Sequence, residues 1–234
     1  MKKNGFTLAE VLITLAIIGV VATMTLPALM TNTQEQQAKT GLKKAINTLT
    51  EAATMNEAID GTNFASLTNY GNVKEDASAE INNNSLFGLL DARTAVDYGK
   101  TKGDDTIPLN AATVIANPQT VYLRDGSAII IPAQGAIPAT AANNRGDNLP
   151  LGYVVVYDTN GAKGPNILSN CMSSANGERP DAATEPAENE ADLDEIPTVN
   201  CTKAQRVIRD QFQLRLRGTT VQPEGAASAW ALNN

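Results

Sequence analysis

The stretch FTLAEVLITLAIIGVVATMTLPALM occupies residues 6–30 and carries one charged side chain, that of Glu10. Its 25 residues would form an α-helix about 37 Å long, enough to cross a hydrocarbon layer about 30 Å thick. Lys2 and Lys3 precede the stretch, so the positive-inside rule predicts a cytoplasmic N-terminus. We therefore expect a single membrane-spanning helix, with the rest of the chain across the membrane.

An apolar N-terminal stretch is also found in a secretory signal peptide, in a plain membrane anchor and in a buried core helix. A signal peptide usually has a shorter apolar core and a small-x-small cleavage site, to which residues 23–25 (Thr-Met-Thr) correspond poorly. A core helix seldom runs this long without charge. Length and charge alone leave the plain anchor open.

Glu10 distinguishes an assembling helix from a plain anchor. A carboxylate inside an apolar helix costs about 2–3 kcal/mol even on insertion scales, so intramembrane acids usually have a partner. Within the apolar stretch, no base lies within two helical turns of Glu10. We expect the partner to come from elsewhere, and the α-amino group of a newly formed N-terminus on a neighbouring chain would serve.

The run Gly5-Phe6-Thr7-Leu8-Ala9-Glu10 resembles the prepilin signal of type IV pilins and type II secretion pseudopilins. In that family a short basic leader ends in Gly, Phe follows, and Glu is the fifth residue after the cut. The resemblance implies cleavage between Gly5 and Phe6 by prepilin peptidase and N-methylation of Phe6. It also implies that Glu10 pairs with the Phe6 amine of an adjacent subunit during assembly.

Pro27 matches the helix-kinking proline of the same family. A proline inside a helix removes one backbone hydrogen bond, and this local weakness could let the helix stretch or melt when subunits pack. A simple bend of the membrane helix at Pro27 accounts for the residue equally well.

After residue 30 the composition becomes polar, and apolar residues recur at spacings of three and four. They are Ala38, Leu42, Ala45, Ile46, Leu49, Ala52, Ala53 and Ile59. The spacing predicts an amphipathic helix that continues the membrane helix and packs on a sheet. Gly41 weakens it by up to about 1 kcal/mol, and Asp60-Gly61 ends it. A coiled coil is the alternative, but the stripe is short and rich in Ala.

The remainder is expected to form a globular α+β head. Residues 61–105 are rich in Asn, Gly, Asp, Ser and Thr, which predicts a long connection with a helical turn near residues 86–94. Strand signals follow at residues 113–116, 120–124, 127–131 and 152–158, and Asp125-Gly126 predicts a hairpin between the second and third. A long helix packed on a small antiparallel sheet is an α+β architecture, and the resemblance implies a pilin-like one.

The chain is thereby divided into four parts. These are a leader (residues 1–5), a transmembrane assembly helix (6–30), an amphipathic helix (31–60) and the head (61–234), which includes an acidic loop between residues 171 and 201.

The run Asp158-Thr159-Asn160-Gly161-Ala162-Lys163-Gly164-Pro165-Asn166 follows the last predicted strand. Asp158 and Asn160, two residues apart and followed by Gly, resemble the start of a calcium-binding loop, although the terminal bidentate acid of an EF-hand is missing. A plain turn also accounts for the run, because Asn-Gly supplies positive φ angles. The run resembles one found in pilin-like proteins, some of which bind calcium in this part of the fold.

Cys171 and Cys201 enclose an acidic segment. An exported head meets an oxidising compartment, so we expect these two residues to form a disulfide, worth roughly 3 kcal/mol in the chain-entropy model. Two free thiols are the alternative. A disulfide-bounded C-terminal region is also a feature of type IV pilins, which the resemblance implies here.

Charge is unevenly distributed near the C-terminus. Residues 178–195 hold eight acids and one base, which sum to −7, whereas residues 203–217 hold five bases and one acid, which sum to +4. We expect the basic segment to meet an acidic loop of its own or of a neighbouring subunit. Two independently solvated surfaces are the alternative, because exposed ion pairs are weak. Nucleic-acid binding is disfavoured, because only Phe212 interleaves these bases.

Composition argues against an enzyme. The chain has no histidine, no CxxC pair and no nucleotide-binding or nucleophile-elbow motif. No catalytic residue and no obligatory cofactor is therefore expected, calcium being the one metal considered. The pattern indicates an inner-membrane structural subunit of a type IV pilus or type II secretion pseudopilus, whose partners are like subunits, prepilin peptidase and the assembly machinery. A membrane-anchored binding module or a minor pilin for DNA uptake would share the same leader.

Overall fold

The computed structural model describes residues 7–73, 84–100, 118–132, 141–142, 148–149, 152–164, 166–171 and 206–233. The chain forms two compact units, Met1–Gln37 and Ala38–Asn234. The helix α1 (Leu8–Asp60) contributes its first part to the N-terminal unit and its second part to the head. Ala38 is the first buried residue among the described side chains of α1, so the structural boundary falls inside the predicted amphipathic helix.

The head part of α1 buries most of the predicted apolar stripe. Ala38, Leu42, Ala45, Leu49, Ala52 and Ala53 are each at most 5% exposed, and Ile46 packs against them. Ile59 was predicted wrongly, because it is 64% exposed. Asn56 takes the buried position in that turn, where its amide donates to the carbonyl and hydroxyl oxygens of Thr62. The predicted end of the helix is confirmed, since Gly61 has a φ of 67° and its N–H donates to Glu57 O.

The sheet of the head has five antiparallel strands in the order β1-β2-β5-β8-β9. They are β1 (Pro118–Tyr122), β2 (Ala128–Pro132), β5 (Tyr153–Asp158), β8 (Gln211–Arg217) and β9 (Thr220–Pro223). The predicted hairpin is confirmed: β1 and β2 pair with Tyr122 opposite Ala128, and Gly126 in the turn has a φ of 92°. Together with α1, this sheet gives the α+β, pilin-like fold that the sequence predicts.

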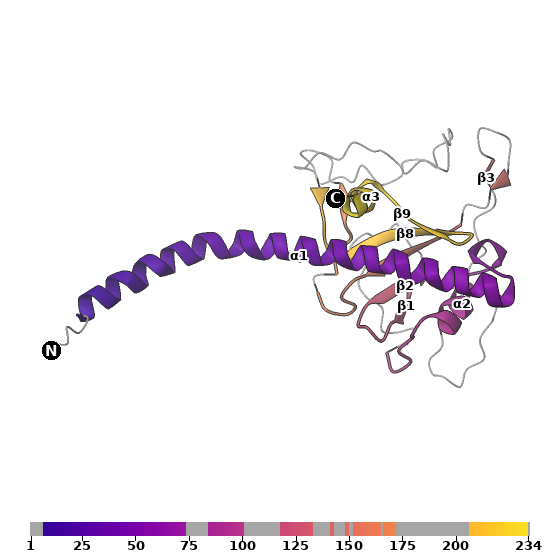
Figure 1. Ribbon diagram of the computed structural model, residues 1–234, viewed down its shortest axis with the longest axis horizontal. Coiled ribbons are helices and arrows are strands. Elements are labelled where there is room, and N and C mark those ends of the chain that lie inside the picture. Colours follow the sequence, from indigo (N-terminus) through magenta and orange to yellow (C-terminus); the bar gives the residue numbers. More distant parts are fainter. Residues whose placement is uncertain are drawn as a thin grey trace. The chain divides into compact units, whose positions relative to one another are not determined.

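Within the head, α1 covers one face of the sheet (Figure 1). Alternate residues of β2 show why: Ile129 and Ile131 pack with Leu42 and Leu49 of α1, whereas Ile130 belongs to a smaller cluster. That second cluster contains Tyr122, Ala128, Ile130, Val156 and Leu168. β2 is therefore buried on both sides, which explains its continuous apolar sequence.

Shorter elements complete the described part of the head. They are η1 (Phe64–Ser66), α2 (Leu86–Arg93), α3 (Ala226–Asn233) and the strand pairs β3 (Ala141–Ala142) with β4 (Asn148–Leu149) and β6 (Asn170–Cys171) with β7 (Arg206–Val207). α2 confirms the predicted helical turn, and Ser85 caps it by accepting from Gly88 N. The predicted strand at residues 113–116 lies outside the described residues.

The C-terminal hairpin of β8 and β9 was not predicted from the sequence, in which this region stands out as a basic segment. Phe212, Leu214 and Leu216 are buried and alternate with Gln213, Arg215 and Arg217. This period of two is typical of a half-buried strand. The excess of basic residues in this region conceals the alternation and therefore the strand.

Candidate functional site

The first turn of α1 is closed by a reciprocal pair of side chains. Glu10 Oε2 accepts from Thr7 N and from Thr7 Oγ1, both at 2.8 Å, and Thr7 Oγ1 accepts from Glu10 N at 3.3 Å. Thr7 therefore occupies the N-cap position and Glu10 the third helical position of a capping box. This arrangement satisfies backbone N–H groups that would otherwise lack a partner at the start of the helix.

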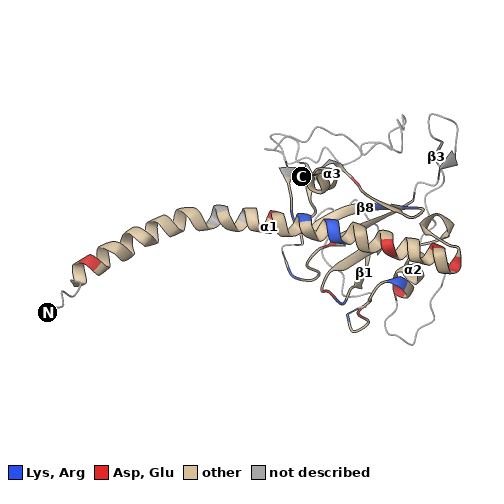
Figure 2. Ribbon diagram, in the orientation of Figure 1, with Lys and Arg blue, Asp and Glu red and all other residues tan. Residues whose placement is uncertain are grey.

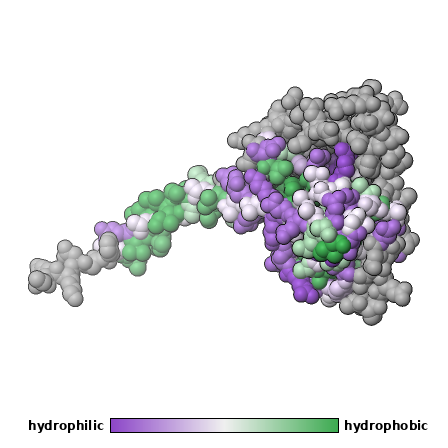
Figure 3. Space-filling model, turned by 45° about the vertical axis from the view of Figure 1, so that its right-hand side comes forward, coloured by the Kyte–Doolittle hydropathy of each residue, from purple (hydrophilic) through white to green (hydrophobic). Residues whose placement is uncertain are grey.

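The helix surface that follows is apolar on every side. Large apolar side chains between Leu8 and Met30 are exposed, from Val11 at 45% to Leu8 at 80%. Glu10 is the one charged residue between Leu8 and Leu26, and the remainder of this part of α1 is uncharged in Figure 2 and largely hydrophobic in Figure 3. A helix that is apolar on all sides is stable in the core of a large protein assembly or in a membrane.

Hydroxyl groups in this apolar surface bond within the helix itself. Thr14 donates to Val11 O at 2.9 Å, and Thr23 donates to Val20 O at 2.8 Å. Each threonine thereby has a partner without water. Within the described residues, Leu8–Leu26 is the one helical segment long and apolar enough to cross a membrane, a test that a secretory signal sequence would also pass.

A sequence family described as the prokaryotic N-terminal methylation motif matches residues 1–26. The chain carries the type IV pilin/pseudopilin signal. This signal implies prepilin peptidase and the pilus assembly machinery as partners, and it indicates a structural protein. No curated protein and no solved structure matches the chain.

The pilin signal extends beyond the described residues. Gly5 and Phe6, the expected cleavage and methylation positions, lie outside them. The structure places Glu10 in the capping box of its own chain. Its pairing with the amine of a neighbouring chain stays a prediction. α1 is continuous through Pro27, and the kink predicted there also stays a prediction.

A second candidate site follows β5, where Asp158 and Asp210 organise a turn. Asp158 Oδ1 accepts from Asn160 N, and Oδ2 accepts from Gln211 Nε2, both at 3.0 Å. Asp210 Oδ2 accepts from Asn166 N at 2.7 Å and from Asn160 Nδ2 at 3.2 Å. The two carboxyl groups thus fix the start and the end of the predicted run from Asp158 to Asn166.

Burial dominates the chemistry of this turn. Asp158 is fully buried, and loss of hydration raises its pKa from an ordinary value near 3.8 to about 7, with hydrogen bonds from Gln211 and Asn160 opposing the rise and the Asp210 charge adding to it. Gly161 has a φ of 65° and lies against the carbonyl of Gly126 in the β1–β2 turn. The glycine is therefore required both by its conformation and by the lack of space.

The oxygen atoms at this turn can be compared with those of a calcium site. Asn160 Oδ1 is buried without a hydrogen-bond partner among the described residues, as a metal-ligating oxygen could be. Against that, the carboxyl oxygens of Asp158 already accept N–H donors, and among the described residues no three His, Cys, Asp or Glu side chains are grouped so that they could hold a metal ion. Calcium needs six to eight oxygens, so these contacts favour the turn, and calcium binding at Asp158 and Asn160 stays a prediction.

The two cysteines are only partly covered by the structure. Cys171 lies in β6 opposite Arg206 of β7, whereas Cys201 lies outside the described residues. This register brings Cys171 beside a position five residues after Cys201, since 206 − 201 = 5. The pairing of β6 with β7 is compatible with a disulfide, which stays a prediction.

Arg215, one of the bases of the basic segment, pairs with an acid of the C-terminal hairpin, and the predicted contact of this segment with an acidic loop stays a prediction. Its guanidinium forms two hydrogen bonds with the carboxylate of Glu224, at 2.8 Å from Nε and 2.7 Å from Nη2. Glu224 follows β9, so the pair closes the C-terminal hairpin. The acidic segment at residues 178–195 and the base Lys203 lie outside the described residues.

Two site residues, Thr7 and Asp210, were not predicted from the sequence. Thr7 was quoted only as part of the motif, although Thr-x-x-Glu before an apolar run is a recognisable capping-box signal. Asp210 was counted as a lone acid in a basic segment, and no local signal connects it with Asn166, 44 residues away in the sequence.

Proposed function

We propose that this protein is a prepilin that is cleaved between Gly5 and Phe6, methylated on Phe6, and polymerised through α1 into a type IV pilus or type II secretion pseudopilus. Before assembly it is an inner-membrane protein that spans the bilayer once, with its N-terminus in the cytoplasm and its head on the far side. The observation that carries the proposal is the position of Glu10. It is a single carboxylate, in an apolar helix, four residues after the expected new N-terminus, within the pilin signal.

The physical basis is the scarcity of partners in an apolar bundle. When identical apolar helices pack, water leaves their surfaces, and a carboxylate at that depth is stable only beside a cation or hydrogen-bond donors. The Phe6 amine of a neighbouring subunit supplies a charge within reach of the first helical turn. The carboxylate of Glu10 reaches that amine at only one relative position of the two helices. The pair would therefore align the subunits as well as neutralise both charges.

The capping box already uses part of the hydrogen-bonding capacity of Glu10. In the single chain the carboxylate of Glu10 already accepts from Thr7 N and Oγ1, both through Oε2. A carboxylate has two oxygens and about four acceptor positions. Glu10 can therefore keep the helix start closed through one oxygen and accept from a neighbouring amine through the other.

The first experiment is mass spectrometry of the N-terminal peptide from filaments sheared from producing cells. An abundant peptide that begins at methylated Phe6 supports the filament proposal. If filaments lack the protein, a processed peptide in the membrane fraction indicates a pseudopilin or minor component. An intact leader, Met1–Gly5, in every fraction would contradict the proposal.

A pair of Glu10 variants separates charge from capping. Glu10→Gln keeps an oxygen for Thr7 but removes the charge, whereas Glu10→Ala removes both. We expect both variants to be inserted and processed, and both to lose filament assembly, measured as sheared protein against membrane protein. Normal assembly of Glu10→Gln would show that the charge is unnecessary.

A further inference from the structure

The end of the head at which α1 enters brings together three segments that are far apart in the sequence. A Cβ atom on Gly41 of α1 would lie 2.6 Å from the side chain of Thr159, in the turn that follows β5. Gly161 of this turn lies against the backbone of the turn between β1 and β2. Lys44 of α1 pairs with Asp125 of the β1–β2 turn at 2.5 Å. The first turns of α1 in the head, the β1–β2 turn and the turn after β5 therefore form one continuous surface.

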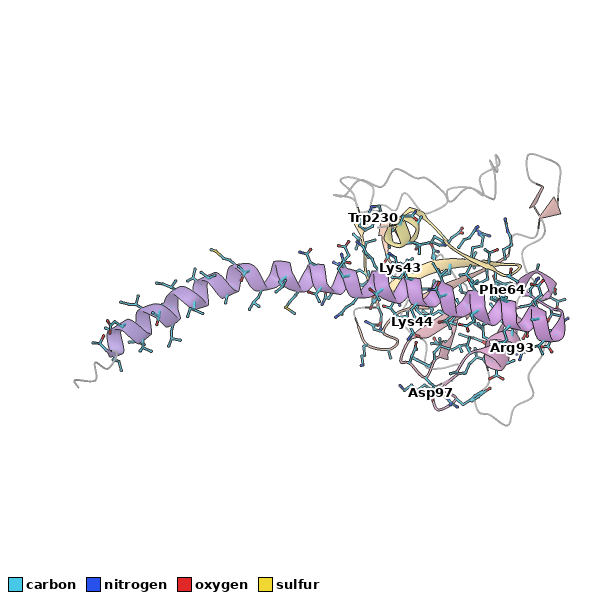
Figure 4. All side chains as sticks on the ribbon, viewed as in Figure 1. Lys43, Lys44, Phe64, Arg93, Asp97 and Trp230 are labelled. Carbon is cyan, nitrogen blue, oxygen red and sulfur yellow. The ribbon has the colours of Figure 1, made fainter. Side chains whose placement is uncertain are left out.

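All three segments carry basic side chains, and we call the surface that they form the basic end. Four of the bases are exposed, and the fifth is half-buried and adjoins, in the sequence, the Asp210 that organises the turn after β5. Figure 4 labels the two bases of α1. The five bases are Lys43, Lys44, Arg124, Lys163 and Arg209.

The acids of the same segments do not balance these bases. Asp125 is the one exposed acid among them, and it pairs with Lys44. Asp158 and Asp210 are buried and accept N–H donors of the turn. Among the described residues, the other four bases form no ion pair. The charges of the basic end sum to +4 (5 − 1 = 4), and to +2 even when both buried acids are counted as ionised (5 − 3 = 2).

Charge is also separated along α1 in the head. Three bases come first, between residues 39 and 44, and three acids follow, between residues 51 and 60 (Figure 2). Between Glu10 and the head, Glu35 is the one charged residue of α1. Along the chain, the basic end therefore adjoins the stretch that leads to the apolar part of α1. This order favours a negatively charged partner on the membrane side of the head.

We propose that the basic end binds anionic phospholipid headgroups at the surface of the bilayer that α1 spans, and so holds the head against the membrane before assembly. Clustered lysine and arginine side chains attract anionic lipid, and arginine can donate paired hydrogen bonds to a phosphate. The inference rests on the proposed function, because only a membrane-spanning α1 brings the head to a bilayer.

The length of α1 allows this contact when the helix is tilted. Lys43 follows Met30, the last residue of the apolar stretch, by 13 residues (43 − 30 = 13), or about 20 Å of helix. The apolar stretch, about 37 Å long, exceeds the hydrocarbon layer of about 30 Å, and membrane helices tilt by up to about 40°. At that tilt Lys43 lies about 15 Å above the hydrocarbon layer, and headgroups fill about 5–7 Å of this distance. The remainder is close to the Debye length of about 10 Å at about 0.1 M salt, so the charges still attract.

Photo-cross-linking identifies what lies against the basic end. The full chain would carry p-benzoylphenylalanine in place of Ala162, an exposed residue of the turn after β5, and would be reconstituted in bilayer nanodiscs. Ala58, exposed near the far end of α1, is the matched control position. With phosphatidylglycerol in the bilayer, we expect phospholipid adducts, identified by mass, at residue 162 severalfold above those at residue 58. In phosphatidylcholine alone, or at high salt, the yield at residue 162 should fall to that of residue 58.

Two results of this experiment would overturn the proposal. One is an equal yield at residues 162 and 58 in the anionic bilayer, and the other is an equal yield at residue 162 in the two lipids. In producing cells, an adduct of protein mass at residue 162 in place of lipid would assign the basic end to an acidic protein instead.

Charge variants show whether the bases cause the contact. Arg124→Glu combined with Lys163→Glu reverses two charges that form no ion pair among the described residues. We expect the adduct yield at residue 162 to fall severalfold, with an unfolding curve, followed by Trp230 fluorescence, that stays in place. Arg124→Lys combined with Lys163→Arg is the matched control, since it keeps both charges and should keep the yield. An unchanged yield after charge reversal, or an equal loss in the control, would contradict the proposal.

The two levels of inference fail differently. A chain that is inserted in the membrane and processed at Phe6, but gives no lipid adduct at residue 162, overturns only the basic end. A chain that is neither inserted nor processed overturns the proposed function together with it.

Discussion

At the scale of single residues, the capping contact of Glu10 and its proposed assembly contact rest on different properties of the carboxylate. The capping box uses its oxygen as an acceptor for Thr7, and the proposed assembly contact uses its charge. Thr7 takes part only in the first role. Substitution of Thr7 therefore isolates what the helix start contributes.

Thr7→Ala removes the hydroxyl that accepts from Glu10 N and donates to Glu10 Oε2. Loss of an N-cap typically costs about 1 kcal/mol, so we expect amide exchange of the first turn of α1 to accelerate roughly fivefold. Hydrogen exchange with mass spectrometry on the detergent-solubilised chain measures this, with Thr7→Ser as the control that retains the cap. Because the charge remains, filaments should still form, and their loss would mean that Thr7 acts beyond the helix start.

Asp158 gives the head a pH-dependent stability whose sign follows from its raised pKa. Between about pH 4 and about pH 7 the folded chain holds a proton on Asp158 that the unfolded chain has released. The unfolded state then binds fewer protons, so the free energy of unfolding falls as pH rises through this window. Above it both states are ionised, and this contribution becomes constant.

Asp158→Asn should remove that decline, because the amide is neutral at every pH and can still accept from Asn160 N. We expect the unfolding free energy of the variant, relative to that of the unaltered chain, to increase as the pH is raised from about 4 to about 8. Denaturant unfolding followed by the fluorescence of Trp230, the one tryptophan, measures this difference. A constant difference across this range would contradict the pKa. Calcium that stabilises the unaltered chain, but not the variant, would support the predicted metal site.

At the scale of elements, α1 is held close to the turn after β5. A Cβ atom on Gly41 would lie 2.6 Å from Thr159 Cγ2 and 2.7 Å from Thr159 Cβ. From the sequence alone, this glycine is only a weak point of the helix. The structure gives its reason: no larger residue lets α1 approach the turn that Asp158 and Asp210 organise.

Gly41→Ala should therefore destabilise the head, although alanine favours helix by about 1 kcal/mol. Overpacking of a tight contact typically costs about 1–3 kcal/mol, so we expect a net loss in the unfolding free energy. Gly19→Ala is the matched control, because nothing lies within 4 Å of a Cβ there. Its unfolding curve, followed by Trp230 fluorescence, should not move to lower denaturant, whereas an unchanged curve for Gly41→Ala would disprove the close approach.

At the scale of the whole molecule, the expected disulfide would join the pairing of β6 and β7 to the end of the acidic segment. Non-reducing peptide mapping should recover Cys171 and Cys201 in one linked peptide. Reduction, or the variant Cys171→Ser with Cys201→Ser, should lower the unfolding free energy by roughly 3 kcal/mol if loop closure is the main effect. Free thiols in the exported protein would show that the pairing is absent.

Elements whose signals are local could be predicted from the sequence alone. The apolar stretch with Glu10, the stripe from Ala38 to Ala53, the end at Gly61 and the hairpin at Asp125-Gly126 all depend on neighbours a few residues away. Helix and turn geometry relates such residues directly, without reference to the rest of the fold. The pilin signal is of the same kind, which explains why 26 residues suffice to recognise it.

Contacts between residues that are distant in the sequence became known from the three-dimensional structure alone. Asp210 serves a turn more than 40 residues earlier in the chain, Gly41 faces Thr159, and Arg215 pairs with Glu224 beyond the end of β9. These contacts arise where α1 and five strands pack, and no sequence period encodes them. Ile59 illustrates the same limit: the spacing placed it in the core, but Asn56 bonded to Thr62 and took the buried position. Burial depends on which polar groups find partners, and that is settled only when the whole chain has folded.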